Sequence, residues 1–445
     1  MLINSIKLSN FKNFQDVEVK LDKMNVIVGA NASGKSNFLQ ALKFLRDIKD
    51  FGIDNAISLQ GGIDYLSNLQ LKDDKTTFLS VVFSPNGGRV IEKFGNDTVI
   101  LHYNSITYSI KITTKKYKKY EVSEENIIYD TAIKVIDFNK IDEAEEHKAK
   151  LFDDITPSEI IRFTLSSNKG KISLSSSLEN KKLAITLSDG TKKEISDDKF
   201  SPIPVPLSFF KKNDVETKEK NVEKGTLIEK FSFFTRMTFL DFSIYDFDLK
   251  KAKESTPITG KIELEENGEN LALILKNILA DKEKQRQFSN LLTDILPFIK
   301  GLNTEKFYDK SLLFKIQEIY NSNSNLPSSL LSDGTISVTA IIVALFFENK
   351  NLAIFEEPEH GVHPALIAKL MQNFYDASEN KQVIITTHSP EMLKHIKSLD
   401  DLLFVSRDEK GFGQITKPIE QEMVKAFLEN ELGIDQLFTQ NLLDN

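Results

Sequence analysis

The segment VIVGANASGKSNFLQALKFL (26–45) contains the residues best suited to chemistry. Gly29, Gly34, Lys35 and Ser36 match the spacing G-x-x-x-x-G-K-S. Glycines at such a turn let backbone N–H groups point inward, where they can cradle phosphates at the start of a helix. Lys35, expected on a solvated loop, would reach the β and γ phosphates of a nucleotide, and Ser36 would ligate Mg²⁺. The spacing therefore predicts a nucleotide site.

The sequence on both sides of this loop has the pattern that the motif requires. The run MNVIV (24–28) is apolar and typical of a β-strand, and Phe38, Leu39, Leu42 and Leu45 fall on one face of a following helix. A strand, a turn and a helix can also produce this spacing by chance. The two flanks together favour a phosphate-binding loop, or P-loop.

Two carboxylates, Glu356 and Glu357, follow a second apolar strand in NLAIFEEPEHGVHP (351–364). The ends of parallel strands meet at the ligand crevice of a sheet, which would bring these acids close to the P-loop. One acid can hold the water shell of magnesium, and the next can polarise the attacking water. Acidic residues also follow strands in ordinary turns, and Pro358 favours a turn here.

Two further elements could contact phosphate. His388 follows the apolar strand in VIITTHSPEML, where an imidazole could bond a γ-phosphate or the attacking water, although a histidine there is often only a polar cap. Ser332 and Gly334 precede a strongly apolar helix in LLSDGTISVTAIIVALFF. Their hydroxyl and backbone N–H groups could form an anion site or an ordinary helix cap.

The elements that must position these residues alternate between strands and helices. Apolar and polar residues alternate in six segments that predict strands of an antiparallel sheet: 2–8, 15–21, 77–83, 98–113, 158–165 and 182–187. Between about 115 and 325, lysine, glutamate and asparagine dominate, which favours exposed helices or mobile loops. From about 268 the pattern predicts two amphipathic helices. The last 120 residues return to the α/β alternation.

Composition limits the class of protein. The 445 residues are 40% hydrophobic and 27% charged, as in soluble globular proteins. No stretch approaches the ~18 apolar residues of a membrane span, and no signal peptide is expected, so a cytoplasmic protein without a membrane partner is predicted. The absence of cysteine excludes disulfides and thiolate metal sites. The net charge of −8 argues against a whole-surface nucleic-acid binder but leaves room for local basic patches.

Taken in order, the P-loop, LSDGT (331–335), the strand with two acids and the strand with His388 resemble the ATP-binding-cassette (ABC) class of ATPases. The chain is most similar to the RecF, SMC and OLD branch, which includes ATPases of bacterial anti-phage defence systems. The opening segment 6–42 resembles the opening of that branch. LLSDGT resembles its signature loop, FEEPEHGVHP its Walker B motif with the following D-loop, and TTHSPEML its switch histidine.

This resemblance implies roles for individual residues, with ATP and Mg²⁺ as cofactors. Five P-loop residues would bind triphosphate and magnesium: Gly29, Asn31, Gly34, Lys35 and Ser36. Lys12 matches a basic residue that often lies near the nucleotide. Glu356 matches the metal-side acid, Glu357 the catalytic base and His388 the γ-phosphate sensor. Gln60, in SLQGG, is the candidate for the Q-loop residue.

The resemblance also implies that Ser332 and Gly334 contact the γ-phosphate of the other subunit. Two departures from the motifs raise questions. Glu356 stands where aspartate is commoner, which puts metal geometry and turnover rate in doubt. Asp333 and Thr335 replace the Gly and Gln of LSGGQ, and an acid near the partner's phosphate could weaken closure of the dimer.

The implied fold is α/β. An ABC-type P-loop head, with a mixed central sheet, flanking helices and an antiparallel β subdomain, would carry a large mixed insertion between P-loop and signature motif. The predicted division is an ATPase lobe over 1–125, an insertion over 126–325 that is β-rich and then helical, and a second ATPase lobe over 326–445. A coupling subunit of a membrane transporter would rarely carry such an insertion.

Two nucleic-acid activities need weighing. OLD relatives carry a Toprim-type nuclease domain after the cassette, but only residues 389–445 follow His388, so no such domain is expected. The D-x-D in YDFD (Tyr245 to Asp248) precedes the signature and is a common loop pattern. In KITTKKYKKYE (111–121), five lysines alternate with Tyr117 and Tyr120. This patch could meet a phosphate backbone or could be an exposed hairpin, so DNA is a conceivable partner.

The predicted function is an ATPase that forms a homodimer or higher oligomer with ATP. It would control a separately encoded effector, a nuclease or toxin, in anti-phage defence. The alternatives are a DNA-repair or chromosome-maintenance clamp of RecF or SMC type, and a scaffold that binds ATP without useful turnover.

Overall fold

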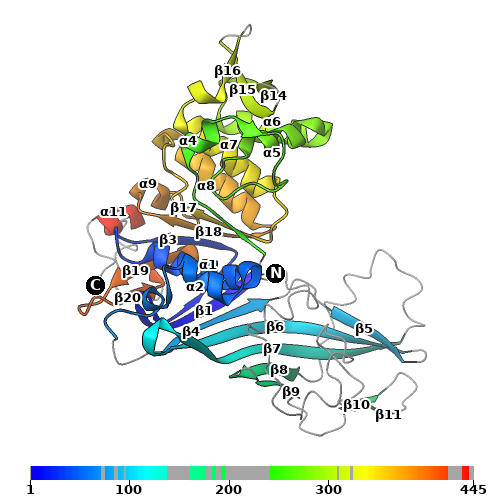
Figure 1. Cartoon of the computed structure of the whole chain (residues 1–445). Helices are drawn as coiled ribbons and strands as arrows, with labels where there is room; N and C mark the ends of the chain where they lie inside the picture. The colour runs from blue at the N-terminus through cyan, green and yellow to red at the C-terminus, as the bar shows by residue number, and fades with distance from the viewer. Residues whose placement is uncertain are drawn as a thin grey trace. The chain divides into compact units, whose positions relative to one another are not determined.

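The computed structural model describes the following residues: 2–71, 76–84, 89–94, 97–137, 160–169, 171–176, 183–186, 192–195, 241–307, 310–320, 324–418 and 433–439. The chain forms two compact units (Figure 1). Unit 1 comprises Met1–Lys20 and Gln40–Leu240, and unit 2 comprises Leu21–Leu39 and Asp241–Asn445. The predicted three-part division of the chain remains a prediction.

Unit 2 contains a mostly parallel sheet. Its strand order is β12 (Ser243–Tyr245), β17 (Leu352–Glu356), β18 (Gln382–Thr387), β3 (Met24–Val28), β19 (Leu402–Arg407) and β20 (Gly413–Thr416). The first five strands are parallel to their neighbours, and β20 is antiparallel to β19. Strands β3 and β18 are buried along their whole length, which is why each contains an uninterrupted apolar run, at 26–28 and 383–385. Because the strands are parallel, their carboxyl ends lie at one edge.

Helices pack on this sheet and on one another (Figure 1). They are α4 (Leu249–Lys253), α5 (Leu271–Ala280), α6 (Lys282–Ile295), α7 (Asp333–Phe346), α8 (Pro364–Ser378), α9 (Pro390–Leu393) and α11 (Ile434–Thr439). Helix α7 is buried from Gly334 to Leu345. A helix that is apolar on every side must lie inside a core, so α7 holds the loop before it at a fixed place.

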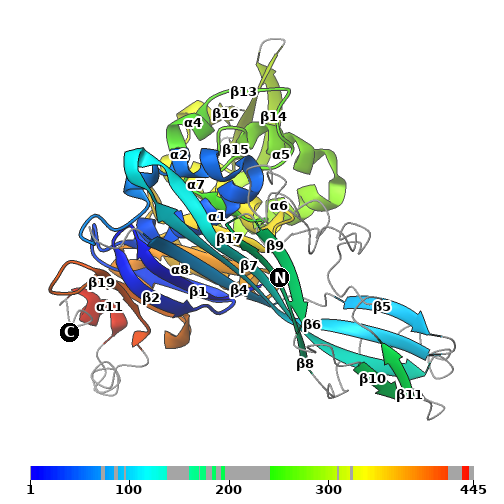
Figure 2. The ribbon, with the colours of Figure 1, turned by 60° about the horizontal axis from the view of Figure 1, so that its bottom comes forward.

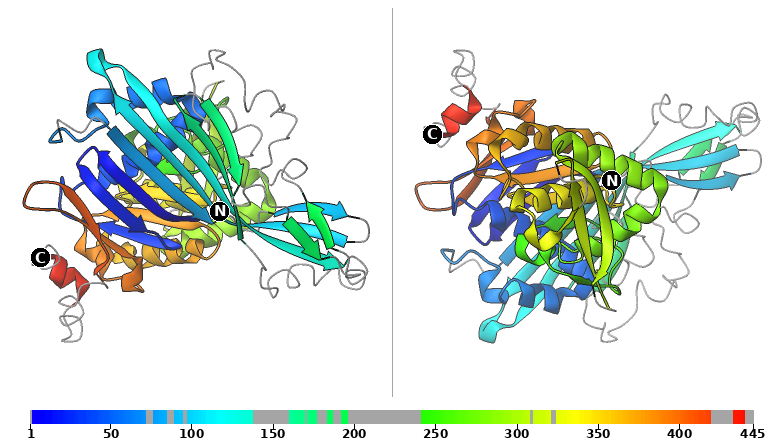
Figure 3. Two further views of the ribbon diagram at one scale, coloured as in Figure 1. Left: turned by 90° about the horizontal axis from the view of Figure 1, so that it is seen from below. Right: turned by 90° about the horizontal axis from the view of Figure 1, so that it is seen from above.

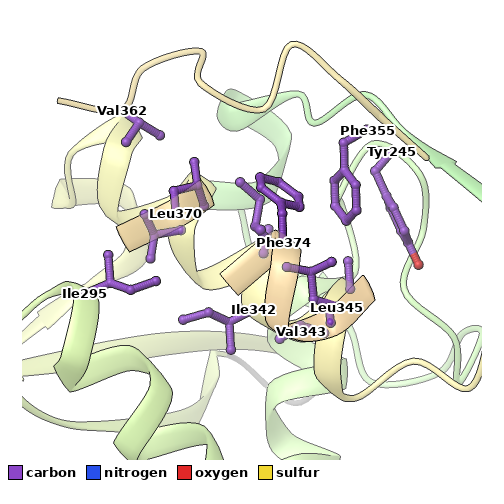
Figure 4. Close-up of a cluster of buried hydrophobic side chains, with 14 of the residues drawn as sticks. Tyr245, Ile295, Ile342, Val343, Leu345, Phe355, Val362, Leu370 and Phe374 are labelled. Carbon is purple, nitrogen blue, oxygen red and sulfur yellow. The ribbon is translucent and has the colours of Figure 1, made fainter. Parts of the chain in front are cut away.

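Aromatic rings fill the core between the sheet and its helices (Figure 4). Phe355 of β17 lies 5.1 Å from the ring of Tyr245 on β12 and 5.1 Å from that of Phe374 on α8. Such ring pairs each add about 0.5–1.5 kcal/mol beyond area burial. Aliphatic side chains of α6, α7 and α8 surround the rings: Ile295, Ile342, Val343, Leu345 and Leu370.

A smaller antiparallel sheet also belongs to unit 2. Its strands are β13 (Thr256–Pro257), β15 (Ser311–Glu318) and β14 (Ile299–Phe307), with β16 (Asn325–Pro327) paired to β15. Leu312, Phe314 and Ile316 of β15 are buried, alternating with partly exposed neighbours. Helix α5 packs against this sheet. A short 3₁₀ turn, η7 (Ser328–Leu330), leads to α7, and another, η8 (Leu399–Asp401), precedes β19.

Unit 1 is an antiparallel sheet with helices (Figures 2 and 3). Its order is β2 (Phe14–Lys20), β1 (Leu2–Phe11), β4 (Thr76–Ser84), β6 (Asp97–Thr114), β7 (Tyr120–Asp137), β8 (Ile160–Asn168) and β9 (Lys171–Ser176), with β5 (Arg89–Phe94) paired to β6. β10 (Leu183–Thr186) and β11 (Lys192–Ile195) form a separate hairpin. The helical elements are α1 (Lys35–Phe51), which begins in unit 2, α2 (Ile53–Leu59), η1 (Ile63–Tyr65) and η2 (Lys116–Lys118).

The predicted α/β class and antiparallel strands are confirmed, and so are the two helices after 268. The preference for helices or loops after residue 115 is wrong for β7, β14 and β15, since these segments are strands. In β14, for example, Lys300, Asn303 and Glu305 occupy exposed positions of the strand. The polar segments 143–154 and 211–230 lie outside the described residues.

Candidate nucleotide and catalytic site

The P-loop connects β3 to α1, as its flanking sequence predicts. A Cβ at Gly29 would lie 2.2 Å from the carbonyl oxygen of Val405 on β19, so a side chain there would collide with backbone. Gly34 has a φ of 129°, which glycine adopts without a Cβ penalty. Ala32 has a φ of 64° and lacks that freedom, at a cost of about 1 kcal/mol. Asn31 lies exposed beside it.

Lys35 lies deeper than the sequence suggests. Its residue surface is only 7% exposed, and its ammonium donates to the carbonyl oxygens of Gly29 (2.8 Å) and Ala30 (3.2 Å). The expectation of a solvated loop position is therefore wrong for this side chain, because the loop wraps around it. Burial lowers the pKa of Lys35. Three nearby carboxylates act in the opposite direction: Glu357 has the largest effect, followed by Glu359 and then Glu356.

Arg407, the last residue of β19, forms a hydrogen bond with Ala32 in the P-loop. Its Nε donates to the carbonyl oxygen of Ala32 at 2.9 Å, and its Nη1 donates to that of Gly411 at 3.3 Å. The bond to Gly411 fixes the guanidinium, and the bond to Ala32 holds that strained residue of the P-loop in place. Sequence reasoning missed Arg407, and the only available signal was its place at the end of a strand.

The two predicted magnesium ligands are in contact with each other. The hydroxyl of Ser36 donates to Oε1 of Glu356. The structure thus joins the start of α1 to the end of β17, and the longer side chain of Glu356 reaches the serine. Mg²⁺ prefers oxygen ligands and usually keeps waters and substrate phosphates around one or two protein groups. Among the described residues no cluster of three or more histidine or acidic side chains is placed to hold a metal ion.

The predicted base and the predicted sensor also meet. Oε1 of Glu357 lies 2.9 Å from Nδ1 of His388. The backbone of Glu357 has a φ of 46°, and its N–H donates to the carbonyl oxygen of Thr386 on β18 at 3.1 Å. Non-glycine residues with positive φ concentrate at functional sites. A carboxylate in contact with an imidazole has the chemistry that a general base would need.

The LSDGT loop caps helix α7. The Ser332 side chain accepts the N–H of Thr335 at 3.2 Å. A Cβ at Gly334 would lie 2.8 Å from the carbonyl oxygen of Gly361, so the loop packs directly on the segment after β17. Asp333 is paired with Lys253 of α4 at 2.5 Å. No local sequence pattern marks this lysine, whose charge offsets the acid that stands in place of glycine.

Lys12 and Gln60 belong to unit 1. The backbone N–H of Lys12 donates to the carbonyl oxygen of Leu66 at 2.9 Å, and burial lowers the pKa of its ammonium. Gln60 is buried, with a side-chain oxygen that has no hydrogen-bond partner among the described residues. A role for either residue near the nucleotide stays a prediction. The structure brings together Lys35, Ser36, Glu356, Glu357 and His388.

Comparison with known proteins identifies the class. Residues 24–394 match the family described as "AAA domain, putative AbiEii toxin, Type IV TA system", and the chain belongs to this family. It is an ATPase of the RecF, SMC and OLD type with an ABC-type P-loop head. No helix among the described residues is long and apolar enough to cross a membrane.

Individual relatives are distant. The chain is 23% identical over 460 residues to the endonuclease GajA of Bacillus cereus (strain VD045), covering 92% of this chain and 77% of GajA. It is 24% identical over 428 residues to an ATP/GTP phosphatase of Helicobacter pylori (strain ATCC 700392 / 26695), covering 94% and 91%. The crystal structure of an SMC head bound to the C-winged helix domain of ScpA gives a TM-score of 0.51 at 13% identity, over 94% of this chain and 98% of that one. The last likeness shows the fold alone.

Proposed function

We propose that this chain binds ATP and Mg²⁺ at the P-loop and hydrolyses ATP with Glu357 as the base. The contact between Glu357 and His388 is the observation that carries this proposal, because it joins a proton acceptor to a group that can hold it in place. Lys35 and the N–H groups of the loop would bind the phosphates. Ser36 and Glu356 would hold the magnesium ion, whose charge would help to neutralise the phosphates.

ATP would join two copies of the chain, with the Ser332 loop of each copy capping the nucleotide of the other. The support is the loop's chemistry. It ends in a capped helix start, where backbone N–H groups and the helix dipole favour an anion. The same loop carries one acid, Asp333, already paired with Lys253. Hydrolysis would then reopen the dimer.

Mixing two inactive variants tests the composite site. Ser332→Arg should bind ATP, because its own P-loop is unchanged, yet fail to dimerise or hydrolyse. Lys35→Ala should bind ATP at least ~10-fold more weakly and therefore not hydrolyse it at the ATP concentration of the assay. A heterodimer of the two contains one intact P-loop facing one intact signature loop, so the mixture should recover ATPase activity that neither variant shows. A Ser332→Arg protein that hydrolyses ATP as a monomer would refute the composite site.

The biological role would be control of a separately encoded nuclease or toxin in anti-phage defence, in the cytoplasm. Membership of a family described as a putative toxin, and similarity to the endonuclease GajA, support this role. The test is copurification of the tagged chain with the product of a neighbouring gene, with ATP and with ADP. An association that changes with the nucleotide supports control of an effector, and a lack of association argues against it.

A DNA clamp is the second candidate, favoured by one feature. At the turn between β6 and β7, the Tyr117 residue is 91% exposed with a φ of 62°, and Lys116 and Lys119 are exposed beside it. Lys115 is instead paired with Glu121 at 2.8 Å. An aromatic ring among lysines can stack on a base while the lysines meet phosphates. Lys116→Glu with Lys119→Glu should weaken DNA binding and flatten its salt dependence if this candidate holds.

A further inference from the structure

Glu359 is a buried carboxylate beside the catalytic residues, and the proposed mechanism does not use it. One of its oxygens, Oε1, accepts a hydrogen bond from the hydroxyl of Thr387, the last residue of β18. The other oxygen, Oε2, is buried and has no hydrogen-bond partner among the described residues. Burial raises the pKa of this carboxyl, and the Thr387 hydroxyl acts in the opposite direction. An acid in this setting costs stability.

The hydroxyl of Thr387 has a second bond on the far side of His388. It accepts the backbone N–H of Ser389 at 2.9 Å. A chain of hydrogen bonds thus runs from the Ser389 N–H through Thr387 to Glu359. His388 is the single residue enclosed by the bond between 387 and 389. Its side chain meets Glu357, two residues before Glu359.

We infer that Glu359 and Thr387 are positioning residues that fix the turn carrying His388, so that its imidazole faces Glu357. This inference rests on the proposed roles of Glu357 and His388. The chain of hydrogen bonds joins two segments: Glu359 lies in the segment after β17, and Thr387 and Ser389 lie at the end of β18 and just after it. The same two segments carry Glu357 and His388, which contact each other. A shift of about 1 Å between two reacting groups can cost about 100-fold in rate, so a buried anchor at this place has a kinetic role.

The acceptor oxygen of Glu359, rather than its negative charge, makes this contact. A neutral amide offers the same carbonyl acceptor to the Thr387 hydroxyl. Glu359→Gln should therefore keep the turn, whereas Glu359→Leu, which has a similar size and no acceptor, should release it. The matched change on the other side is Thr387→Val, which keeps the shape and removes the hydroxyl, and Thr387→Ser restores that hydroxyl.

The experiment measures kcat, KM and ATP affinity for the purified full-length chain. Thr387→Val and Glu359→Leu should each lower kcat about 10-fold, with ATP affinity within about 2-fold, and Thr387→Ser and Glu359→Gln should stay near wild type. Ser378→Ala is the control for general loss of stability. It removes a buried hydroxyl that donates to the Tyr375 carbonyl oxygen at 2.7 Å, on helix α8, and should leave kcat unchanged.

Adding Thr387→Val to a His388→Ala variant tests whether Thr387 acts by positioning His388 or affects turnover independently. In a His388→Ala chain, adding Thr387→Val should change kcat no further, because the group that it positions is gone. If the two losses multiply instead, Thr387 does not act through His388 and the inference is wrong. Wild-type kcat for Thr387→Val would also overturn it. Wild-type kcat for His388→Ala would refute the proposed role of His388 itself, which is a distinct failure.

Discussion

The P-loop and the LSDGT loop of unit 2 both lead to the start of a long helix, but they are built differently. The P-loop encloses a buried cation, Lys35, with three carboxylates nearby, and it contains a strained residue, Ala32. The LSDGT loop has a serine cap and a close backbone contact between Gly334 and Gly361. Its one acid is paired with a lysine from another helix.

This difference shows where the chemistry can occur. In the proposed function, the P-loop end would supply a cation for phosphate, oxygen ligands for magnesium and a base held by an imidazole. The LSDGT end offers only a helix start that can cap an anion. On this proposal the P-loop end would react and the LSDGT end would bind the nucleotide of the other copy, as a site made from one end of each of two copies requires.

The largest effect is expected for Glu357→Gln, which removes the base from the P-loop end. The side chain keeps its size and its contact with His388 but loses most of its ability to accept a proton. Turnover should fall about 10²- to 10⁴-fold, while ATP affinity stays within a few-fold. Phosphate release and ATP binding are measured on the same preparation. Nearly normal turnover would move the catalytic role elsewhere, most directly onto Glu356.

Lys35→Ala should affect binding most. Charge-assisted hydrogen bonds contribute about 1.5–3 kcal/mol each, so ATP affinity should fall at least ~10-fold. Because the ammonium also bonds the carbonyl oxygens of Gly29 and Ala30, the thermal midpoint should drop slightly as well. The matched control is Lys23→Ala, an exposed lysine of the same unit that bonds the Glu379 carbonyl oxygen. Equal ATP affinity in the two variants would refute the P-loop assignment.

The Lys253→Ala variant tests the proposed role of the LSDGT loop. This change leaves the charge of Asp333 unpaired at the start of α7, where it would repel a partner's phosphate. A partly exposed ion pair is worth up to about 1 kcal/mol, so ATP-driven dimerisation should weaken by up to ~5-fold. Affinity for ATP at the chain's own P-loop should not change. Sedimentation with ATP measures the dimer.

The double variant Lys253→Ala with Asp333→Asn is the matched comparison. Removing both charges should restore dimerisation to near the wild-type level, because the lost lysine then has nothing to offset. If the double variant is as weak as Lys253→Ala, the lysine acts by contact or packing and not by neutralising Asp333.

The two ends also differ in how far sequence predicts them. Strands β3, β17 and β18 contain short apolar runs followed by polar or glycine residues, so their strand character and their polar ends follow from simple patterns. Strand β7 was missed because the polar residues Glu124 and Asp130, on the side opposite Ile127 and Tyr129, and the buried acid Glu125 hide the alternation of apolar residues.

Four residues of the site could not be predicted for a different reason. Lys253, Glu359, Thr387 and Arg407 act through contacts made by the folded chain. Lys253 is 80 positions from Asp333, and Arg407 is 375 positions from Ala32. No local pattern marks a residue whose partner is so far away in sequence. The P-loop motif, in contrast, lies within eight consecutive residues, 29–36, so its spacing can be recognised in the sequence.

The smallest expected effect concerns strain in the P-loop, tested by Ala32→Gly. At a φ of 64° the alanine side chain costs about 1–2 kcal/mol, while glycine adds about 0.4–1 kcal/mol of chain entropy to the unfolded state. The net gain should be about 0.5 kcal/mol, seen as a small rise in the thermal midpoint.

Ala30, in the same loop, is not among the described residues with positive φ, so Ala30→Gly should lower the midpoint instead. Opposite signs for two alanines two positions apart would place the strain at residue 32. If both variants lower the midpoint, the brace from Arg407 has removed the strain. The double variant Ala32→Gly with Arg407→Ala then tests whether the effect of residue 32 on the thermal midpoint depends on the hydrogen bond from Arg407.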